Sequence, residues 1–192
     1  MNQARRLSDY WMTAAQFMDW PGDGTGRSYQ LVDGEPLAMA PPSQTHSRLQ
    51  ARLIYHLTSQ LRAQGSNCEA LIGPGVRPRP DMAHNVRVPD VAVTCFPNTS
   101  RFVDQPVFIA EILSPSNVRE TREAVRAVLA IPSLREVLVL GSEAITAELL
   151  LRGSDGDWPT EPTEFGPDDK LVLASLGISL AISELYEGLG LT

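Results

Sequence analysis

Two acidic residues lie inside apolar segments of this chain, where charged side chains are unexpected. Asp90 lies in the run Val88–Val93, and Glu111 lies in the run Phe108–Leu113. A buried charge without a partner costs on the order of several kcal/mol, so such an acid usually has a compensating cation or hydrogen-bond donors. If the two segments are neighbouring strands, their carboxylates can share one hard cation. Mg²⁺ is the natural candidate, with Mn²⁺ as a substitute, because both take oxygen ligands.

Simpler explanations exist for both acids. Asp90 can cap a turn after Pro89, and Glu111 can pair with an arginine of the following segment, which offers Arg119, Arg122 and Arg126. Two acids alone do not decide between these alternatives and a metal site.

A central sheet is needed to position the two acids. Segments rich in β-branched residues and bounded by Pro or Gly predict strands over Ala70–Val76, Val86–Cys95 and Pro106–Leu113. Further strands are predicted over Glu136–Leu140 and Ala144–Leu151. The acids then lie on two of the central strands.

Helices and turns complete a fold of the α/β (α+β) class. Capping residues and helical spacing predict a short helix over Ala14–Asp19 after Thr13, a long helix from Ser43 to about Gln64, and a third from Ser116 to about Ala130. The Asp33-Gly34 dipeptide predicts a β-hairpin of Tyr29–Val32 with Glu35–Met39. Gly153–Asp169 is expected to be a loop, and Leu171–Leu189 a short strand and a helical turn. Residues 1–192 are expected to form a single domain.

The composition is that of a globular protein, with 43% hydrophobic and 20% charged residues. No apolar run approaches the roughly 18 residues of a membrane-spanning helix, so a cytoplasmic protein without membrane contact is expected. Cys68 and Cys95 form no Cys-x-x-Cys motif and are expected to be reduced thiols.

Charge limits how this chain can contact nucleic acid. The formal net charge of −7 disfavours general coating of DNA, so any contact must be local. Arg77, Arg79 and Arg87 alternate with prolines and apolar residues before Asp90, and they can form a local phosphate-contacting stripe. The alternative is that they only balance nearby acids. Lys170 is the one lysine among 16 basic residues.

Several segments together resemble the bacterial Uma-two family of restriction-endonuclease-like proteins, within the PD-(D/E)XK nuclease superfamily. The resemblance covers nearly the whole chain. It is carried by Met12–Phe17, Tyr29–Glu35, Pro41–Ser43 with His46, Val88–Val91, Ala110–Ser116, Ile131–Glu136, and Leu176–Ile178 before Leu185-Tyr186.

The resemblance implies a restriction-endonuclease-like fold, with a mixed central sheet flanked by helices. It also implies Mg²⁺ bound by Asp90, Glu111 and the Ile112 carbonyl, and hydrolysis of DNA phosphodiester bonds. The matching histidine, His46, is expected near the site. Glu35, just after the hairpin turn, is either a third carboxylate there or a solvent-facing strand residue.

The chain departs from the family pattern where a lysine is expected. Leu113 stands two residues after Glu111, and Ala124 and Val128 stand at the positions for the lysine and tyrosine on the next helix. Gln30 replaces the usual glutamate before the hairpin turn. The leading hypothesis is therefore a metal-dependent endonuclease that hydrolyses DNA, either active or catalytically degenerate because the usual lysine is missing. One alternative is a non-catalytic nuclease-fold protein that binds DNA or a protein partner, either as a monomer or as a homodimer. Another is a small-molecule phosphodiesterase.

Overall fold

A six-stranded mixed sheet forms the centre of the molecule. The structure is a computed structural model, and it describes residues 10–78, 83–97, 99–115 and 117–191. The strand order is β3-β4-β5-β6-β7-β8, and only β5 and β6 are parallel. The strands are β3 (Glu69–Ile72), β4 (Val91–Thr94), β5 (Pro106–Leu113), β6 (Glu136–Gly141), β7 (Ala147–Leu151) and β8 (Thr163–Phe165).

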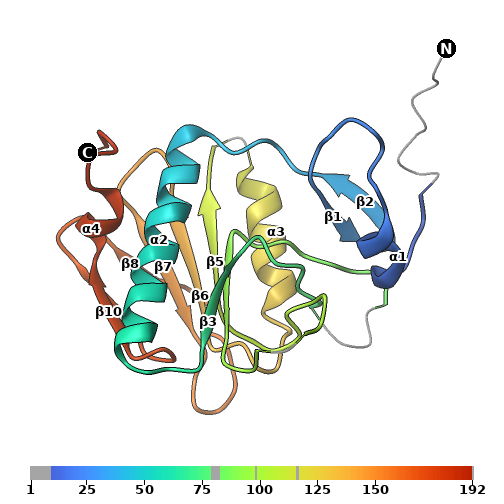
Figure 1. The fold of residues 1–192 in the computed structure, drawn as a ribbon. Coiled ribbons are helices and arrows are strands. Elements are labelled where there is room, and N and C mark those ends of the chain that lie inside the picture. Colours follow the sequence, from blue (N-terminus) through green and yellow to red (C-terminus); the bar gives the residue numbers. More distant parts are fainter. Residues whose placement is uncertain (1–9, 79–82, 98, 116, 192) are drawn as a thin grey trace.

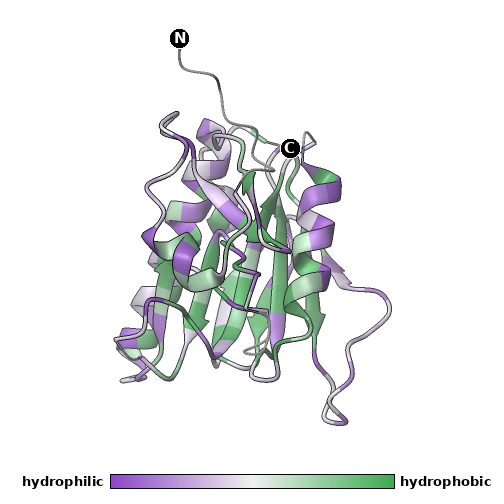
Figure 2. Ribbon diagram, turned by 90° about the vertical axis from the view of Figure 1, so that its right-hand side faces the viewer, coloured by the Kyte–Doolittle hydropathy of each residue, from purple (hydrophilic) through white to green (hydrophobic). Residues whose placement is uncertain are grey.

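One helix covers each face of this sheet (Figure 1). The apolar stripe of α2 (Gln44–Ala63) packs with Phe108, Ala110 and Ile112 on one face. The buried side of α3 (Val118–Val128) packs on the other face with Ile109, the intervening strand residue. Strand side chains alternate between faces, so Glu111 belongs to the α3 side. Figure 2 shows the strands coloured mostly hydrophobic and the helices carrying hydrophilic turns.

A separate N-terminal unit lies beside the sheet and is joined to it by the segment before Asp90. It contains α1 (Ala14–Asp19) and the hairpin of β1 (Tyr29–Val32) and β2 (Glu35–Ala38). At the turn Gly34 has a φ of 88°, and a Cβ there would come within 2.3 Å of the ring of Trp11. Leu31 of β1 forms an antiparallel bridge with Val86, which ties the hairpin to the chain leading into β4.

The C-terminal segment forms a second hairpin, of β9 (Lys170–Leu173) and β10 (Ile178–Ala181), followed by α4 (Ile182–Tyr186). A fully buried carboxylate, that of Glu136, fixes its turn by accepting hydrogen bonds from the backbone N–H groups of Ala174 at 2.7 Å and Ser175 at 3.2 Å.

The structure confirms the predicted fold class, the short helix after Thr13, the hairpin at Asp33-Gly34 and the long helix after Ser43. Four details differ. The C-terminal segment, expected to contain one short strand, forms the two strands of the β9–β10 hairpin. The first two predicted strands are shorter, because the chain around Val86 pairs with the hairpin instead of extending β4. The predicted loop Gly153–Asp169 contains the edge strand β8. Ser116 lies outside the described residues, and Asn117 is the residue that precedes α3.

Among the described residues, no helix combines the length and the apolar character needed to cross a membrane.

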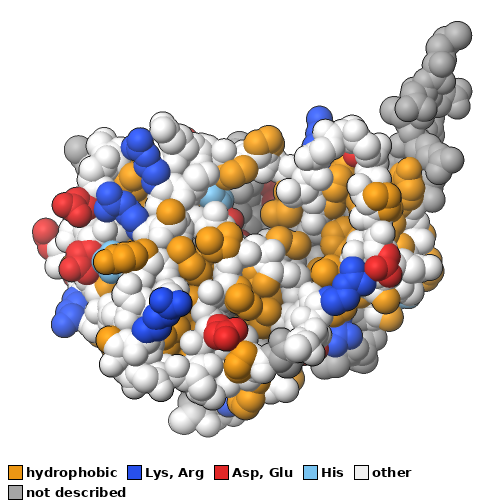
Figure 3. Space-filling model, in the orientation of Figure 1, with side chains coloured by type: hydrophobic (Ala, Val, Ile, Leu, Met, Phe, Trp, Pro, Cys, Tyr) orange, Lys and Arg blue, Asp and Glu red, His pale blue; other side chains and the backbone are white. Residues whose placement is uncertain are grey.

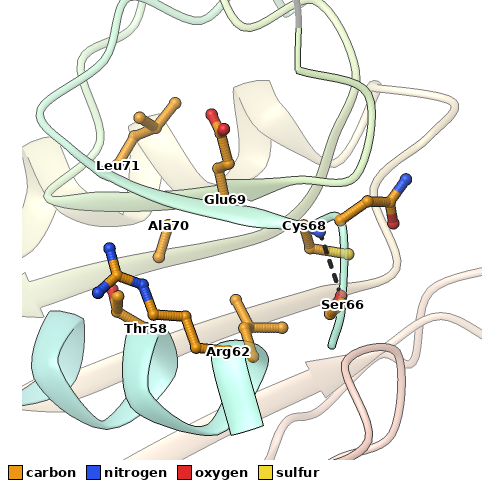
Figure 4. A pocket seen from close by; sticks show the side chains of 9 residues that line it. Thr58, Arg62, Ser66, Cys68, Glu69, Ala70 and Leu71 are labelled. Atoms are coloured by element: carbon orange, nitrogen blue, oxygen red, sulfur yellow. Dashed lines mark hydrogen bonds between the residues drawn. The ribbon is translucent and has the colours of Figure 1, made fainter. Parts of the chain in front are cut away.

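The prediction of two reduced thiols is wrong, because Cys68 and Cys95 form a disulfide. The register of β3 and β4 pairs Glu69 with Thr94, so the cysteines are the next residues opposite each other across the two strands. Sequence spacing gives no sign of this proximity, which only the strand pairing creates. Cys68 also lines a cavity of about 410 Å³ between the end of α2 and β3 (Figure 4).

The disulfide closes the loop that carries Asp90, so its loss should destabilise the fold. Cys68 and Cys95 are 27 residues apart in sequence. A cross-link over a loop of this length is expected to contribute about 2–4 kcal/mol by restricting the unfolded chain. Chemical denaturation with and without a reductant should show this difference in unfolding free energy for the wild type. The Cys68→Ser/Cys95→Ser variant should show none. Equal stability of oxidised and reduced wild type would contradict the expectation.

Candidate active site

Asp90 and Glu111 face each other where the β4–β5 ladder ends. Val91 pairs with Ala110 in this antiparallel ladder, and continuing the register by one residue places Asp90 opposite Glu111. Opposite residues of an antiparallel pair project from the same face of the sheet. The sequence-based prediction that the two acids lie on neighbouring strands therefore agrees with the register.

Side chains complete the hydrogen bonding of this ladder end. The Ile112 N–H donates to Asp90 Oδ2 at 2.7 Å. The Asp90 backbone acts on Glu111 by lowering its pKa, against the larger effects that raise it. Asp90 is therefore held by the backbone of the opposite strand.

The first turns of α2 hold Asp90 from the other side. Ser43 caps the helix by accepting a hydrogen bond from the His46 N–H at 3.1 Å. One turn apart on the same helix face, His46 Nε2 lies 2.8 Å from Asp90 Oδ1, and Gln50 Nε2 donates to the Asp90 carbonyl at 2.8 Å. An ionised carboxylate only accepts hydrogen bonds. When Asp90 is ionised, His46 is therefore the donor, through its Nε2–H.

The two carboxylates place like charges opposite each other, and this arrangement changes the pKa of Glu111. Burial raises the pKa of Glu111 well above its ordinary value of 4.5, and the neighbouring charge of Asp90 raises it further. The Arg87 charge opposes this rise but does not cancel it. In Figure 3 a histidine and acidic side chains are visible together in a recess between α2 and the hairpin. The site has the negative charge that a cation would balance.

Arg87 is the basic residue of this site. It lies between the hairpin and the sheet, and its backbone exchanges two hydrogen bonds of 2.8 Å with Val76. Its Nη1 donates to Gln30 Oε1 at 3.4 Å. Burial lowers the pKa of Arg87, and the charges of Asp33, Glu123 and Glu111 act against that lowering.

The other predicted site residues have different surroundings. Arg77 donates from Nε to Asp104 Oδ1 at 2.9 Å and lies over the ring of Phe102, so it is engaged away from the acids. Arg79 lies outside the described residues. Glu35 is exposed on β2, and in the part of the chain that the structure describes it makes no hydrogen bond or ion pair with the site.

The simpler explanation for Glu111 does not hold. Arg122 forms a two-pronged ion pair with Glu148 of β7, with Nη2 2.6 Å from Oε1. Arg119 lies near Glu120 and Glu123 on its own helix. Among the described residues, neither of these arginines nor Arg126 forms an ion pair with Glu111.

Sequence reasoning missed Gln50, which supports the Asp90 backbone. The available signal was its spacing of four residues from His46, which places both on one helix face. Sequence reasoning also grouped Arg87 with Arg77 and Arg79 in one stripe. In the structure, the charge of Arg87 acts on Glu111. The segment that carries Arg87 is placed by the Leu31–Val86 bridge, which leaves no mark in the local sequence.

Comparison with known proteins identifies the family of this chain. Residues 14–183 match the model of a family described as "Putative restriction endonuclease", Uma2. The chain belongs to the Uma2 family. An uncharacterised protein of Synechocystis is 28% identical to this Uma2 chain over 182 residues, covering 93% of each.

The fold also matches a solved structure. The crystal structure of a protein from Anabaena variabilis, described as a "putative nuclease belonging to DUF820", superposes with a TM-score of 0.72 at 19% identity. The match covers 91% of this chain and 97% of that one. The Uma2 chain thus has a nuclease-like fold.

The positions where the family pattern predicts lysine and tyrosine have no polar function here. Val128 is fully buried and Ala124 is 9% exposed on the inner side of α3. Leu113 packs against the same apolar cluster. These residues have been absorbed into the core between α3 and the sheet.

Glu111 should make stability depend on pH. Its pKa is raised on folding, so its protonated form stabilises the fold at low pH, and this stability is lost as pH rises from about 4.5 through the raised pKa. Glu111→Gln should not show this pH-dependent loss of unfolding free energy. Above the raised pKa of Glu111, the variant should be more stable than wild type by about 1.4 kcal/mol for each unit by which folding raises that pKa. Metal-free chemical denaturation between acid and neutral pH measures the difference. Glu161→Gln, at an exposed loop residue, is the control. Parallel pH profiles for wild type and Glu111→Gln would refute a raised pKa.

Proposed function

We propose that this Uma2 protein is a divalent-metal-dependent nuclease that hydrolyses DNA phosphodiester bonds at Asp90 and Glu111. The observation that carries the proposal is the pair of opposed carboxylates, with Asp90 held by His46 and by the Ile112 N–H. Family membership supports the reaction class.

The residues present fit a hard cation. Mg²⁺ in proteins commonly takes one or two carboxylates and keeps several waters, and the raised pKa of Glu111 indicates a site that lacks positive charge. Within the described ranges, no group of three or more His, Cys, Asp or Glu residues could hold a metal. Asp90 and Glu111 would therefore hold Mg²⁺ or Mn²⁺ with water and, by family resemblance, the Ile112 carbonyl.

Each residue has a distinct task in this proposal. A divalent cation, when bound, supplies Lewis-acid stabilisation of charge on the phosphate. His46 and the Ile112 N–H orient the two oxygens of Asp90, which limits how far that carboxylate can rotate. Gln50 and the Gly73 N–H both donate to the Asp90 carbonyl and fix the backbone beneath it.

A second candidate is a nuclease-fold protein that binds DNA without cleaving it. The observation that favours it is the apolar environment of Leu113, Ala124 and Val128, where the family pattern predicts a lysine. Without that lysine, the site keeps its acids but lacks a group that can carry a proton in the reaction. Arginine does not take this role, because it stays protonated at neutral pH.

Metal titration and cleavage assays with Asp90→Asn separate the two candidates. Asparagine keeps the shape of the side chain but removes its charge, so Mg²⁺ binding by calorimetry should be lost. Cleavage of duplex and single-stranded DNA should fall by about 100-fold or more. The exposed Glu161→Gln variant should match wild type in both assays.

Three other outcomes change the proposal. Metal binding without cleavage in wild type would favour the second candidate. Absence of Mg²⁺ and Mn²⁺ binding in wild type would refute the metal site. Cleavage that survives in Asp90→Asn would place the reaction elsewhere in the chain.

A further inference from the structure

Arg87 is a half-buried cation, and not all of its hydrogen-bond donors have an acceptor among the described residues. A guanidinium presents several N–H donors in a planar fork, and here one of them reaches Gln30 at a long 3.4 Å. Its Nε is buried and has no hydrogen-bond partner in the part of the chain that the structure describes. Among the described residues, Arg87 forms no ion pair within 4.0 Å. A buried donor without an acceptor is costly, so such groups in folded proteins often mark a functional site.

Strand pairing fixes the backbone from which the Arg87 side chain extends. Two backbone hydrogen bonds join Arg87 to Val76, and Val86, the preceding residue, pairs with Leu31 of the hairpin. The side chain therefore starts from a segment held on both sides. Its reach is set from a backbone that the hairpin and the strand-like pairing with Val76 hold in place.

The acids around Arg87 favour its positive charge, but they leave some of its N–H donors without an acceptor. Asp33 of the hairpin turn, Glu123 of α3 and Glu111 all act on it through their charges, but none accepts a direct hydrogen bond from it. A group that offers two oxygens to the fork would use the remaining donors. A phosphate does so, because arginine binds phosphate with two parallel hydrogen bonds.

Other basic side chains near the site are engaged elsewhere. Arg77 is paired with Asp104, and Arg122 is paired with Glu148. The nearby positions where the family pattern has a lysine are filled by apolar residues. Arg87 is the basic residue whose charge acts on Glu111.

We propose that Arg87 binds a non-bridging phosphate oxygen of the DNA beside Asp90 and Glu111, and so supplies the positive charge that lysine provides in the family pattern. The inference rests on the proposed function for its ligand, the DNA phosphate. The role is electrostatic: Arg87 holds the phosphate and stabilises its charge, but it carries no proton in the reaction.

Binding of a labelled duplex oligonucleotide, followed by fluorescence anisotropy over a series of KCl concentrations, tests this role. The buffer contains Ca²⁺, a hard cation that takes the same oxygen ligands. Arg87→Gln should weaken binding by about 10-fold and lower the slope of log K against log salt by about one. Arg87→Lys should keep the slope but bind more weakly than wild type, because it keeps the charge and loses the fork.

Arg135→Gln is the matched control, since it removes one exposed arginine at the start of β6, the end of the sheet away from the acids. It should change affinity by less than about twofold. Thermal unfolding of each variant verifies that it is folded. If Arg87→Gln does not fold, Arg87→Met decides, because it keeps most of the apolar stem and removes the charge: affinity and salt slope equal to those of wild type would overturn the proposal.

Two further results would overturn it. One is an Arg87→Gln variant that binds like Arg135→Gln, and the other is a wild type that does not bind the duplex. Hydrolysis is measured with Mg²⁺ on the same samples. Lack of hydrolysis with intact Arg87-dependent binding would refute the nuclease proposal and leave the phosphate-binding role standing.

Discussion

Two carboxylates opposite each other at the end of one strand pair are the constraint on which the rest of the site depends. The like charges of Asp90 and Glu111 oppose this arrangement, and the Ile112 N–H holds Asp90 in it by donating to Oδ2. Antiparallel pairing of β4 with β5 makes this possible, and α2 adds His46 as a support from outside the sheet.

The fold positions the compensating charge from a different direction. The N-terminal hairpin pairs with the chain just before Asp90, and the charge of Arg87 in this segment acts on Glu111. The core between α3 and the sheet is apolar where the family pattern has lysine. The site thus has apolar residues at the lysine positions of the family pattern, on β5 and α3. Its positive charge comes instead from Arg87, in the segment before β4.

Much of the fold was predictable because its signals are local. Thr13 and Ser43 cap helices through their own side chains, and Asp33-Gly34 forms its turn through backbone conformations that those residues tolerate. The pairing of Asp90 with Glu111 was predictable as a possibility, because both acids interrupt apolar strands. The Cys68–Cys95 disulfide and the place of Arg87 were not, since both arise from pairing between segments far apart in sequence.

Joint binding of a divalent cation by Asp90 and Glu111 is the central proposal for this protein. The most direct measurement is the pKa of the Glu111 carboxyl, followed by NMR during a pH titration with and without Mg²⁺. We expect a pKa above 4.5 in the metal-free protein, caused by burial and by Asp90, and a clear fall when Mg²⁺ is added, because the cation favours the ionised form. A pKa that Mg²⁺ leaves unchanged would contradict the metal site.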